Sequence, residues 1–215
     1  MLYLDFDGVI ADSATECLKI TEIQNNMQLS PEQQLIFLDN RYLVNEPFGF
    51  TLLLSLVIKE QFSEEDYKSL YKSTSIADQV KINSAFFACR SQYIESNGIE
   101  NWVNLNPPTY FFELIKKRGK EIIIVSTKDD EALSIWCKQN NFNVSEIHGN
   151  ESYRYYGSKY DLISTYRHDM SKVFIDDNLE HVINRDWHAI NCKAITAGWG
   201  YNNLTDNLDD VIGYL

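Results

Sequence analysis

Four apolar runs along the chain each end at small or polar residues. They cover residues 1–4, 121–125, 172–175 and 189–195, with a weaker run at 143–147. Runs that stay apolar without alternating are typical of strands buried on both faces, as in a parallel sheet covered by helices. The pattern therefore predicts a parallel sheet whose first strand lies at the very start of the chain.

The segments between the later runs have helical patterns. Residues 109–117 carry apolar side chains at helical spacing, directly after a pair of prolines. Residues 129–140 open with acidic residues, which suit a helix N-terminus, and place Leu133 and Trp136 on one face. Strands alternating with helices after about residue 105 predict an α/β fold, a Rossmann-like, doubly wound parallel sheet.

The pattern changes between the first strand and about residue 104. Strand-like runs disappear, and helix-like stretches are separated by breaks at Ser30-Pro31, at residues 46–49 and at Asn97-Gly98. The apolar run at 50–58 is too short to span a bilayer and predicts a buried helix. A long helical segment after a single strand indicates an insertion into the sheet.

This organisation predicts two domains. The core comprises residues 1–12 and 105–215, and an all-helical cap comprises residues 13–104. An insertion after the first strand would lie over the carboxyl ends of the strands, where open α/β sheets bind ligands. We therefore expect the cap to cover a binding site.

Composition narrows the class of protein. Hydrophobic residues make up 44% and charged residues 23% of the 215 residues, as in an ordinary soluble globular protein. The formal net charge of -12 argues against a nucleic-acid partner, because phosphate backbones bind basic surfaces. The four scattered cysteines predict buried thiols rather than a disulfide frame or a zinc site. With no export signal visible, we expect a cytoplasmic protein without membrane contact; nothing fixes its oligomeric state.

Two carboxylates stand at the end of the first strand. Asp5 and Asp7 are two residues apart, so on an extended backbone their side chains face the same side. Two acids held there can bind a hard cation, and one of them can attack an electrophile. Gly8 lets the backbone turn away in a conformation that other residues resist. The segment is therefore a candidate metal-assisted active site.

Polar side chains follow the other predicted strands in the same way. Ser126 and Thr127 follow the second strand, Asp176 and Asp177 follow a later one, and Lys159 lies at a loop or helix start. Because the carboxyl ends of parallel strands meet in one crevice, we expect these groups to lie near Asp5 and Asp7.

Read in order, these segments resemble the four motifs of the haloacid dehalogenase-like (HAD) hydrolases. The segments are Asp5-Phe-Asp7-Gly8-Val9, the apolar run into Ser126, Lys159, and Phe174-Ile-Asp176-Asp177. Residues 195–201 also resemble the last-strand segment of the phosphoglycolate phosphatase and β-phosphoglucomutase-like branch, whose helical C1-type cap matches the predicted insertion. The compact Asp176-Asp177 pair departs from the spaced form of close phosphoglycolate relatives, which weakens a substrate assignment.

The resemblance implies a Mg²⁺-dependent phosphatase that hydrolyses a small soluble phosphomonoester, such as a sugar phosphate. It implies that Asp5 forms an aspartyl-phosphate and that Asp7 acts as general acid and then base. Ser126 would hold a phosphoryl oxygen and Lys159 would neutralise charge. An acid at position 7 favours phosphoryl chemistry, since the family's dehalogenases lack it.

The resemblance also implies a metal site and substrate contacts. Mg²⁺ would take Asp5, the backbone carbonyl of Asp7, and Asp176 or Asp177, with Asp177 the first choice. The expected substrate-binding residues are Gly8, Thr127 and, for an anionic end of the substrate, the cap residue Arg41.

Several alternatives stay open at this point. Ser126 could cap the following helix while Thr127 holds the phosphate, and Lys128 could take the place of Lys159. His148, His168, His181 and His188 share no ligand spacing and are interpreted as structural. Rival functions are a phosphomutase of the β-phosphoglucomutase type, using the same Asp5 intermediate, and a catalytically silent HAD-fold binding module.

Overall fold

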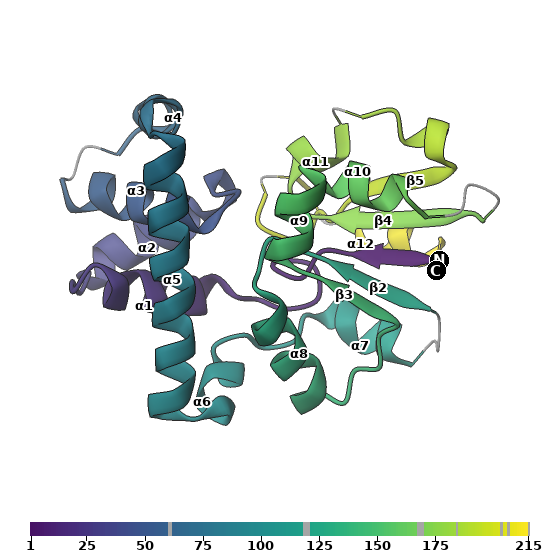
Figure 1. Ribbon diagram of the computed structural model, residues 1–215, viewed down its shortest axis with the longest axis horizontal. Helices are drawn as coiled ribbons and strands as arrows, with labels where there is room; N and C mark the ends of the chain where they lie inside the picture. The colour runs from purple at the N-terminus through teal and green to yellow at the C-terminus, as the bar shows by residue number, and fades with distance from the viewer. Residues whose placement is uncertain are drawn as a thin grey trace. The chain divides into compact units, whose positions relative to one another are not determined.

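The structure is a computed structural model that describes residues 1–59, 62–117, 121–166, 170–183, 185–202, 204–205 and 207–214. It divides into two compact units, the core unit Met1–Asp12 with Pro107–Leu215, and the helical unit Ser13–Asn106 (Figure 1). The core unit contains both ends of the chain, whereas the helical unit is one continuous segment.

In the described part of the core unit, five strands form one parallel sheet. They are β1 (Leu2–Leu4), β2 (Ile122–Val125), β3 (Glu146–His148), β4 (Lys172–Asp176) and β5 (Cys192–Thr196), in the order β3-β2-β1-β4-β5. The predicted α/β class and doubly wound parallel sheet are confirmed. The chain winds from β1 towards β2 and β3 on one side and crosses back to β4 and β5 on the other, so the strand order reverses between β1 and β4.

Buried apolar side chains fix the register of the central strands. Leu4 pairs with Ile124 of β2 and with Ile175 of β4, and every residue of β1 and β2 is buried. Because all three strands are covered on both faces, a shift of one residue would move their apolar side chains out of register with the helices. The residues that follow β1 and β4 are therefore held next to each other.

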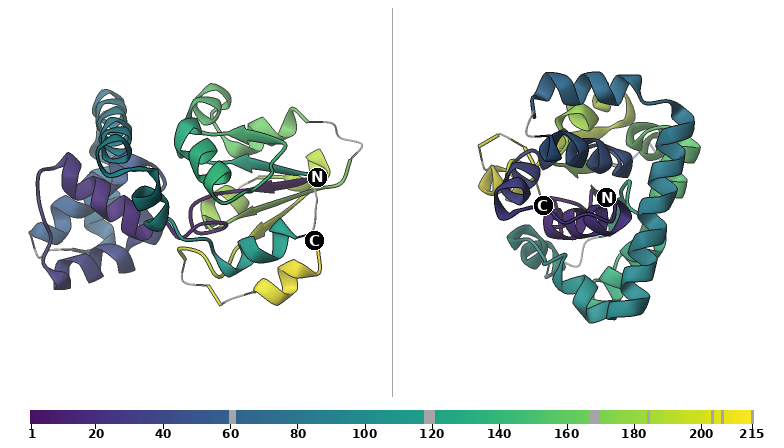
Figure 2. Two further views of the ribbon diagram at one scale, coloured as in Figure 1. Left: turned by 90° about the horizontal axis from the view of Figure 1, so that it is seen from below. Right: turned by 90° about the vertical axis from the view of Figure 1, so that its left-hand side faces the viewer.

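Helices lie on both sides of this sheet (Figure 2). They are α7 (Tyr110–Lys116), α8 (Asp130–Gln139), α9 (Asn150–Tyr156), α10 (Lys159–Ser164), α11 (Leu179–Ile183) and α12 (Leu208–Ile212), with the 3₁₀ turn η2 (Trp187–Ile190). On one face Phe6 meets Trp136 of α8 edge to face, with ring centroids 5.1 Å apart. On the other, Tyr3 and Phe174 share a buried cluster with Leu162 and Ile163 of α10.

Two of the predicted strand boundaries are wrong. Residues 189 and 190 belong to η2, which the carboxylate of Asp186 caps by accepting from the Ala189 N–H at 3.3 Å. Asn191 has a left-handed φ of 52°, so the chain turns before β5 begins at Cys192. The apolar pattern does not distinguish this turn from a strand. The weaker run at 143–147 also moves along the chain, because β3 covers Glu146–His148.

In its described residues the helical unit contains helices joined by short loops, and no strand. They are α1 (Ala14–Gln24), α2 (Pro31–Asp39), the 3₁₀ turn η1 (Arg41–Leu43), α3 (Pro47–Ile58), α4 (Glu64–Ser73), α5 (Ile76–Asn97) and α6 (Ile99–Asn104). The breaks at Ser30-Pro31 and Asn97-Gly98 coincide with helix ends: Ser30 forms a capping box with Gln33, and Gly98 has φ 86°. Residues 47–49 are not a break, because Pro47 stands in the first turn of α3, where its missing N–H costs nothing.

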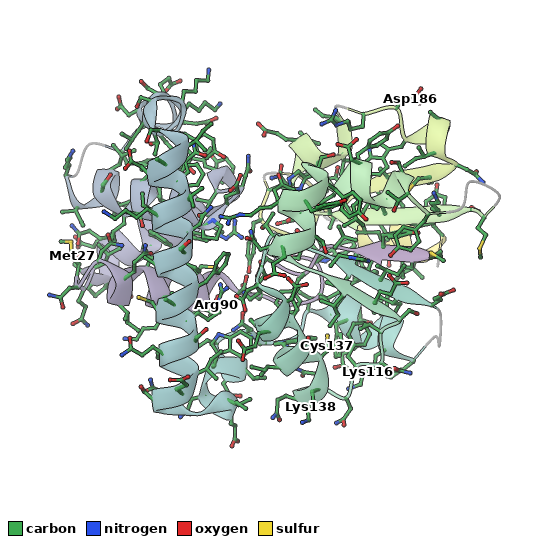
Figure 3. The ribbon with its side chains drawn as sticks, viewed as in Figure 1. Met27, Arg90, Lys116, Cys137, Lys138 and Asp186 are labelled. Carbon is green, nitrogen blue, oxygen red and sulfur yellow. The ribbon has the colours of Figure 1, made fainter. Side chains whose placement is uncertain are left out.

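A buried ion pair lies inside the helical unit. The Arg90 guanidinium, on α5 (Figure 3), donates through Nε to Oε1 of Glu16 at 2.6 Å and through Nη2 to Oε2 at 3.2 Å. The indole of Trp102 donates to the same Oε1 at 3.3 Å, and the guanidinium stacks over Phe86, 4.9 Å from the ring centroid. The carboxylate of α1 therefore ties α5 and α6 together. No helix in the described segments is long and apolar enough to cross a membrane.

Candidate functional site

Three carboxylates gather where the strand order reverses. The N–H of Asp5 donates to the carbonyl of Ile175 at 2.9 Å, which holds the end of β1 against the end of β4. Asp5, Asp176 and Asp177 are buried, and each offers an oxygen within 4.8 Å of the others. Open α/β sheets bind ligands at this point of the topology. These three residues are named the acid cluster below.

Lys159 lies within the acid cluster. Its ammonium is 3.0 Å from Oδ1 of Asp5 and 2.8 Å from Oδ2 of Asp176, and its side chain is 2% exposed. The neighbouring Ser158 caps α10 by accepting from the N–H of Asp161 at 3.0 Å, so Lys159 is the first residue of that helix. Of the two lysines that the sequence left open, Lys159 is the one that contacts Asp5.

Asp176 is surrounded by donors. Its Oδ2 accepts from Lys159 and lies 2.9 Å from Nδ1 of His181, while Oδ1 accepts from the N–H of Asn178 at 2.8 Å. Burial alone would raise the pKa of Asp176, but the Lys159 ammonium and the His181 ring outweigh it and hold that pKa well below its usual range. Asp176 is therefore a carboxylate that the protein itself keeps ionised.

Asp5 is in the opposite electrostatic situation. Burial raises the pKa of Asp5 to about 6; the Lys159 ammonium opposes this shift, and the carboxylates of Asp176 and Asp7 add to it. The side chain thus carries its negative charge against the preference of its surroundings. A bound cation would relieve this surplus of negative charge, and carboxylate oxygens are the ligands that hard divalent cations prefer.

Asp177 lies between two glycines. A Cβ on Gly8, whose φ is 77°, would lie 2.3 Å from Oδ2 of Asp177, and a Cβ on Gly200 would lie 2.2 Å from its Cβ. The N–H of Tyr201 donates to Oδ2 of Asp177 at 2.7 Å. Both positions therefore require glycine, since any side chain there would displace the carboxylate.

Asp7 contacts the second lysine. Oδ1 of Asp7 lies 3.1 Å from the ammonium of Lys128, whose side chain is 1% exposed. The carboxylate of Asp7 is not one of the three that converge in the acid cluster. Both lysines that the sequence proposed as alternatives are thus present at the site, each on a different carboxylate of the first motif.

Ser126 and Thr127 lie in the loop that follows β2. The hydroxyl of Ser126 is buried and accepts from the N–H of Lys128 at 3.2 Å. It does not cap α8, because that cap is Asp129, whose carboxylate accepts from the N–H of Ala132 at 2.8 Å. The carbonyl of Thr127 accepts from the side-chain amide of Asn150 at 3.1 Å.

Arg41 belongs to the helical unit. Its Nη1 donates to the carbonyl of Val44 at 2.9 Å, and its guanidinium lies 4.8 Å from the ring centroid of Phe50. These contacts hold the side chain within its own unit, and a role of Arg41 towards substrate stays a prediction.

Two contacts of the site were not predicted from the sequence. From spacing alone His181 has no role, yet it lies against Asp176, five residues earlier in the chain. His148 contacts Glu146 and Tyr166, and His168 lies outside the described residues. The other unpredicted contact is that of Lys128 with Asp7. A local signal for this contact does exist: His181 lies only five residues after Asp176, in the short helix α11 that follows β4.

An aromatic-lined cavity of about 410 Å³ adjoins the first motif within the core unit. Its lining includes Gly8, Asp12, Trp199 and Tyr201. The indole of Trp199 donates to the carbonyl of Val9 at 3.2 Å, and the hydroxyl of Tyr201 donates to Asp12 at 2.6 Å. The segment after β5 therefore braces the loop that carries Asp7 and Gly8.

Neither a family model nor a curated protein sequence matches the chain. Solved structures share its fold. A predicted phosphoglycolate phosphatase from Haemophilus somnus 129PT aligns over 100% of this chain and 96% of its own, with a TM-score of 0.57 and 14% identity. A proposed phosphoglycolate phosphatase from Lactobacillus plantarum aligns over 97% of this chain and 89% of its own, with a TM-score of 0.59 and 12% identity.

A third similar structure contains a metal. The magnesium-bound form of YfnB from Bacillus subtilis, a proposed HAD-hydrolase, aligns over 92% of this chain and 86% of its own, with a TM-score of 0.50 and 12% identity. These likenesses show that the chain has the fold of HAD-like hydrolases, as its motifs predicted.

Proposed function

We propose that this protein is a Mg²⁺-dependent phosphatase that hydrolyses a small soluble phosphomonoester through an aspartyl-phosphate on Asp5. One observation carries the proposal: the Asp5 carboxylate lies in a buried acid cluster with Asp176 and Asp177, 3.0 Å from the ammonium of Lys159. The residues proposed as nucleophile, as oxygen ligands and as cation for the phosphoryl group are thus close together at the end of β1, which supports the proposal.

The acid cluster fits a magnesium ion in its chemistry. Its donors are all oxygens, and burial, with a smaller contribution from the carboxylates of Asp176 and Asp7, raises the pKa of Asp5. Asp177 is the proposed direct ligand beside Asp5 and the Asp7 carbonyl, because Lys159, His181 and a backbone N–H already engage Asp176. When bound, the metal would neutralise the carboxylates and orient the phosphoryl oxygens.

The protein side chains would then divide the work of two displacements. In the first, an oxygen of Asp5 forms a bond to phosphorus, the bond to the leaving oxygen breaks, and Asp7 gives that oxygen its proton. In the second, Asp7 takes a proton from water as the water attacks the aspartyl-phosphate, which releases phosphate and restores Asp5. Lys159 and the hydroxyl of Ser126 would hold phosphoryl oxygens throughout.

The proposed substrate is a sugar phosphate or a related metabolite in the cytoplasm. The helical unit would act as a cap that excludes water and large substrates, with Arg41 as a candidate for an anionic end. Gly8 and Thr127 would contact the phosphate from the loops after β1 and β2. Two similar structures carry the name phosphoglycolate phosphatase, which supports a small anionic substrate without identifying it.

The test is phosphate release from sugar phosphates, nucleotides, phosphoglycolate and p-nitrophenyl phosphate, with Mg²⁺ or EDTA. Metal-dependent release by the wild type that is lost in Asp5→Asn would support the phosphatase. Conversion of a sugar 1-phosphate to its 6-phosphate, primed by a sugar bisphosphate, would instead support the mutase. A folded protein that binds neither Mg²⁺ nor phosphate would overturn both and favour a silent module.

A further inference from the structure

Lys128 is a buried cation on the general acid of the proposed reaction. Its ammonium lies 3.1 Å from Oδ1 of Asp7. It also lies 5.2 Å from the ring centroid of Phe6, the residue that precedes Asp7. Its side chain is 1% exposed, whereas that of Asp7 is 15% exposed. The carboxylate of Asp7 is therefore paired with a buried lysine and is itself partly accessible to solvent.

Backbone contacts fix the position of Lys128. Its N–H donates to the hydroxyl of Ser126 at 3.2 Å, and its carbonyl accepts from the N–H of Asn150 at 2.8 Å. The next loop is also held, since the N–H of Gly149 donates to Asp130 at 3.0 Å. These contacts fix the backbone from which the Lys128 side chain reaches Asp7, so the contact with Asp7 is preorganised.

Another buried lysine shows what a structural role looks like in this fold. Lys172, at the amino end of β4, donates to the carbonyls of Ile163 at 3.2 Å and Tyr166 at 3.0 Å. Those partners are neutral, whereas Lys128 is directed at a carboxylate at the opposite, carboxyl end of the sheet. The partners therefore indicate different roles: Lys172 binds backbone carbonyls and stabilises the fold, whereas Lys128 balances the charge of Asp7.

The balance of charge at the site depends on Lys128. The carboxylates of the acid cluster and of Asp7 face the ammonium groups of Lys128 and Lys159. With a divalent cation bound and Asp7 ionised, these four carboxylates are matched by the two ammonium groups and the two charges of the cation. Without Lys128, one negative charge would remain beside the place where a phosphate dianion must enter, and repulsion at such distances in a partly buried site is large.

We infer that Lys128 is a positioning residue that holds the Asp7 carboxylate and compensates its charge, so that the metal-loaded site admits a phosphate dianion. The inference rests on the proposed function and assigns Lys128 a part in it. Lys128 acts through Asp7: when Asp7 loses its charge, Lys128 is no longer needed for the binding of phosphate.

The experiment measures the binding of inorganic phosphate and of Mg²⁺ by calorimetry, without turnover. In Lys128→Met the Kd of phosphate at saturating Mg²⁺ should rise roughly tenfold to a hundredfold, the effect of one unit charge a few ångström away. The Kd of Mg²⁺ should fall, because the site becomes more negative. Asp7→Asn should shift both constants in the opposite directions, and the charge-balanced double variant should bring phosphate binding back near the wild-type value.

Matched variants separate this effect from a general loss of a lysine. Lys138→Met removes an exposed lysine from α8 (Figure 3), and Lys172→Met removes the buried structural lysine. Neither should change the Kd of phosphate. Lys128→Arg keeps the charge and should retain most of the phosphate affinity, with the loss of activity expressed in kcat rather than KM. Urea unfolding confirms that each variant is folded.

The outcomes distinguish this inference from the proposed function. If Lys128→Met shifts the two constants no more than Lys138→Met does, or the double variant binds phosphate no better than Lys128→Met, the inference is overturned while the phosphatase stands. If the wild type releases no phosphate from any ester yet the binding constants shift as expected, the proposed function fails and the role of Lys128 in anion binding is retained.

Discussion

The two units each bury charged side chains, and they do so in opposite ways. In the helical unit, Glu16 meets Arg90 through two hydrogen bonds, and Trp102 donates to the same carboxylate. In the core unit, the acid cluster brings three carboxylates together around one lysine. One arrangement is matched in charge and the other has a surplus of negative charge.

The difference indicates what each arrangement is for. In a matched buried pair the two charges compensate each other, so the pair specifies how the helices pack and needs no bound ion. A surplus of buried carboxylates raises the free energy of the folded protein. The pKa of Asp5 is raised mainly by burial, and the carboxylates of Asp176 and Asp7 add to the shift. Such a cluster is a candidate site for a cation that would compensate its negative charge. The predictions below test that contrast, from the largest expected effect to the smallest.

Asp5→Asn should reduce turnover about 10⁴-fold or more, because it removes the proposed nucleophile. The same change should raise the free energy of unfolding at pH 8 by about 1–2 kcal/mol in the absence of metal, since it removes a carboxylate whose ionised form is disfavoured. Phosphate release and urea unfolding measure the two effects. If Asp5→Asn is less stable than the wild type, the idea that the ionised Asp5 carboxylate destabilises the metal-free protein is wrong.

Arg90→Met should lower the free energy of unfolding by about 3–5 kcal/mol, because it leaves the carboxylate of Glu16 buried without its cation. The double variant Glu16→Leu with Arg90→Met should recover much of this loss, as the site becomes apolar. Urea unfolding of both variants is the measurement. An equal loss in the double variant would mean that shape, rather than charge, makes the pair important.

Lowering the pH should weaken the binding of Mg²⁺ before it unfolds the protein. The pKa of Asp5 in the folded protein, about 6, is above its ordinary value, so below that pH a proton competes with the metal for this carboxylate. The Kd of Mg²⁺ should rise about tenfold per pH unit below about 6. Calorimetry between pH 5 and 8 measures it, and in Asp5→Asn this dependence should disappear.

The smallest effect is expected at an exposed ion pair of the helical unit. Lys68 pairs with Glu64 one turn earlier on α4, and both side chains are largely in solvent. Because water screens such a pair, Lys68→Ala should leave the urea midpoint unchanged within error. A loss comparable to that of Arg90→Met would show that burial is not what separates strong from weak pairs in this unit.

The sequence predicts the sheet well because its strands are buried on both faces. Apolar runs locate β1, β2 and β4 to within a residue or two, and the acids that end β1 and β4 meet because those strands are neighbours. The pattern fails at residues 189–190, which belong to a 3₁₀ turn that buries Ile190 and leaves Ala189 exposed. Burial is visible in a sequence, whereas backbone conformation at a short apolar segment is not.

The pairing of charges inside the site could not be predicted in the same way. The sequence places Lys128 and Lys159 near the first motif and leaves open which of them acts there. The structure shows that Lys159 meets Asp5 and Lys128 meets Asp7. That division depends on side-chain reach between residues more than a hundred positions apart, which neither periodicity nor spacing encodes.

The discontinuity of the core unit has a consequence for the order in which the protein is made. Leu2 pairs with Ile122 and with Val173, so β1 leaves the ribosome long before either of its partners exists. The helical unit, a continuous segment with its own apolar core, can be complete while β1 is still an unpaired edge. The carboxylate of Asp5 therefore becomes buried late in synthesis, together with the Lys159 ammonium that partly offsets its charge.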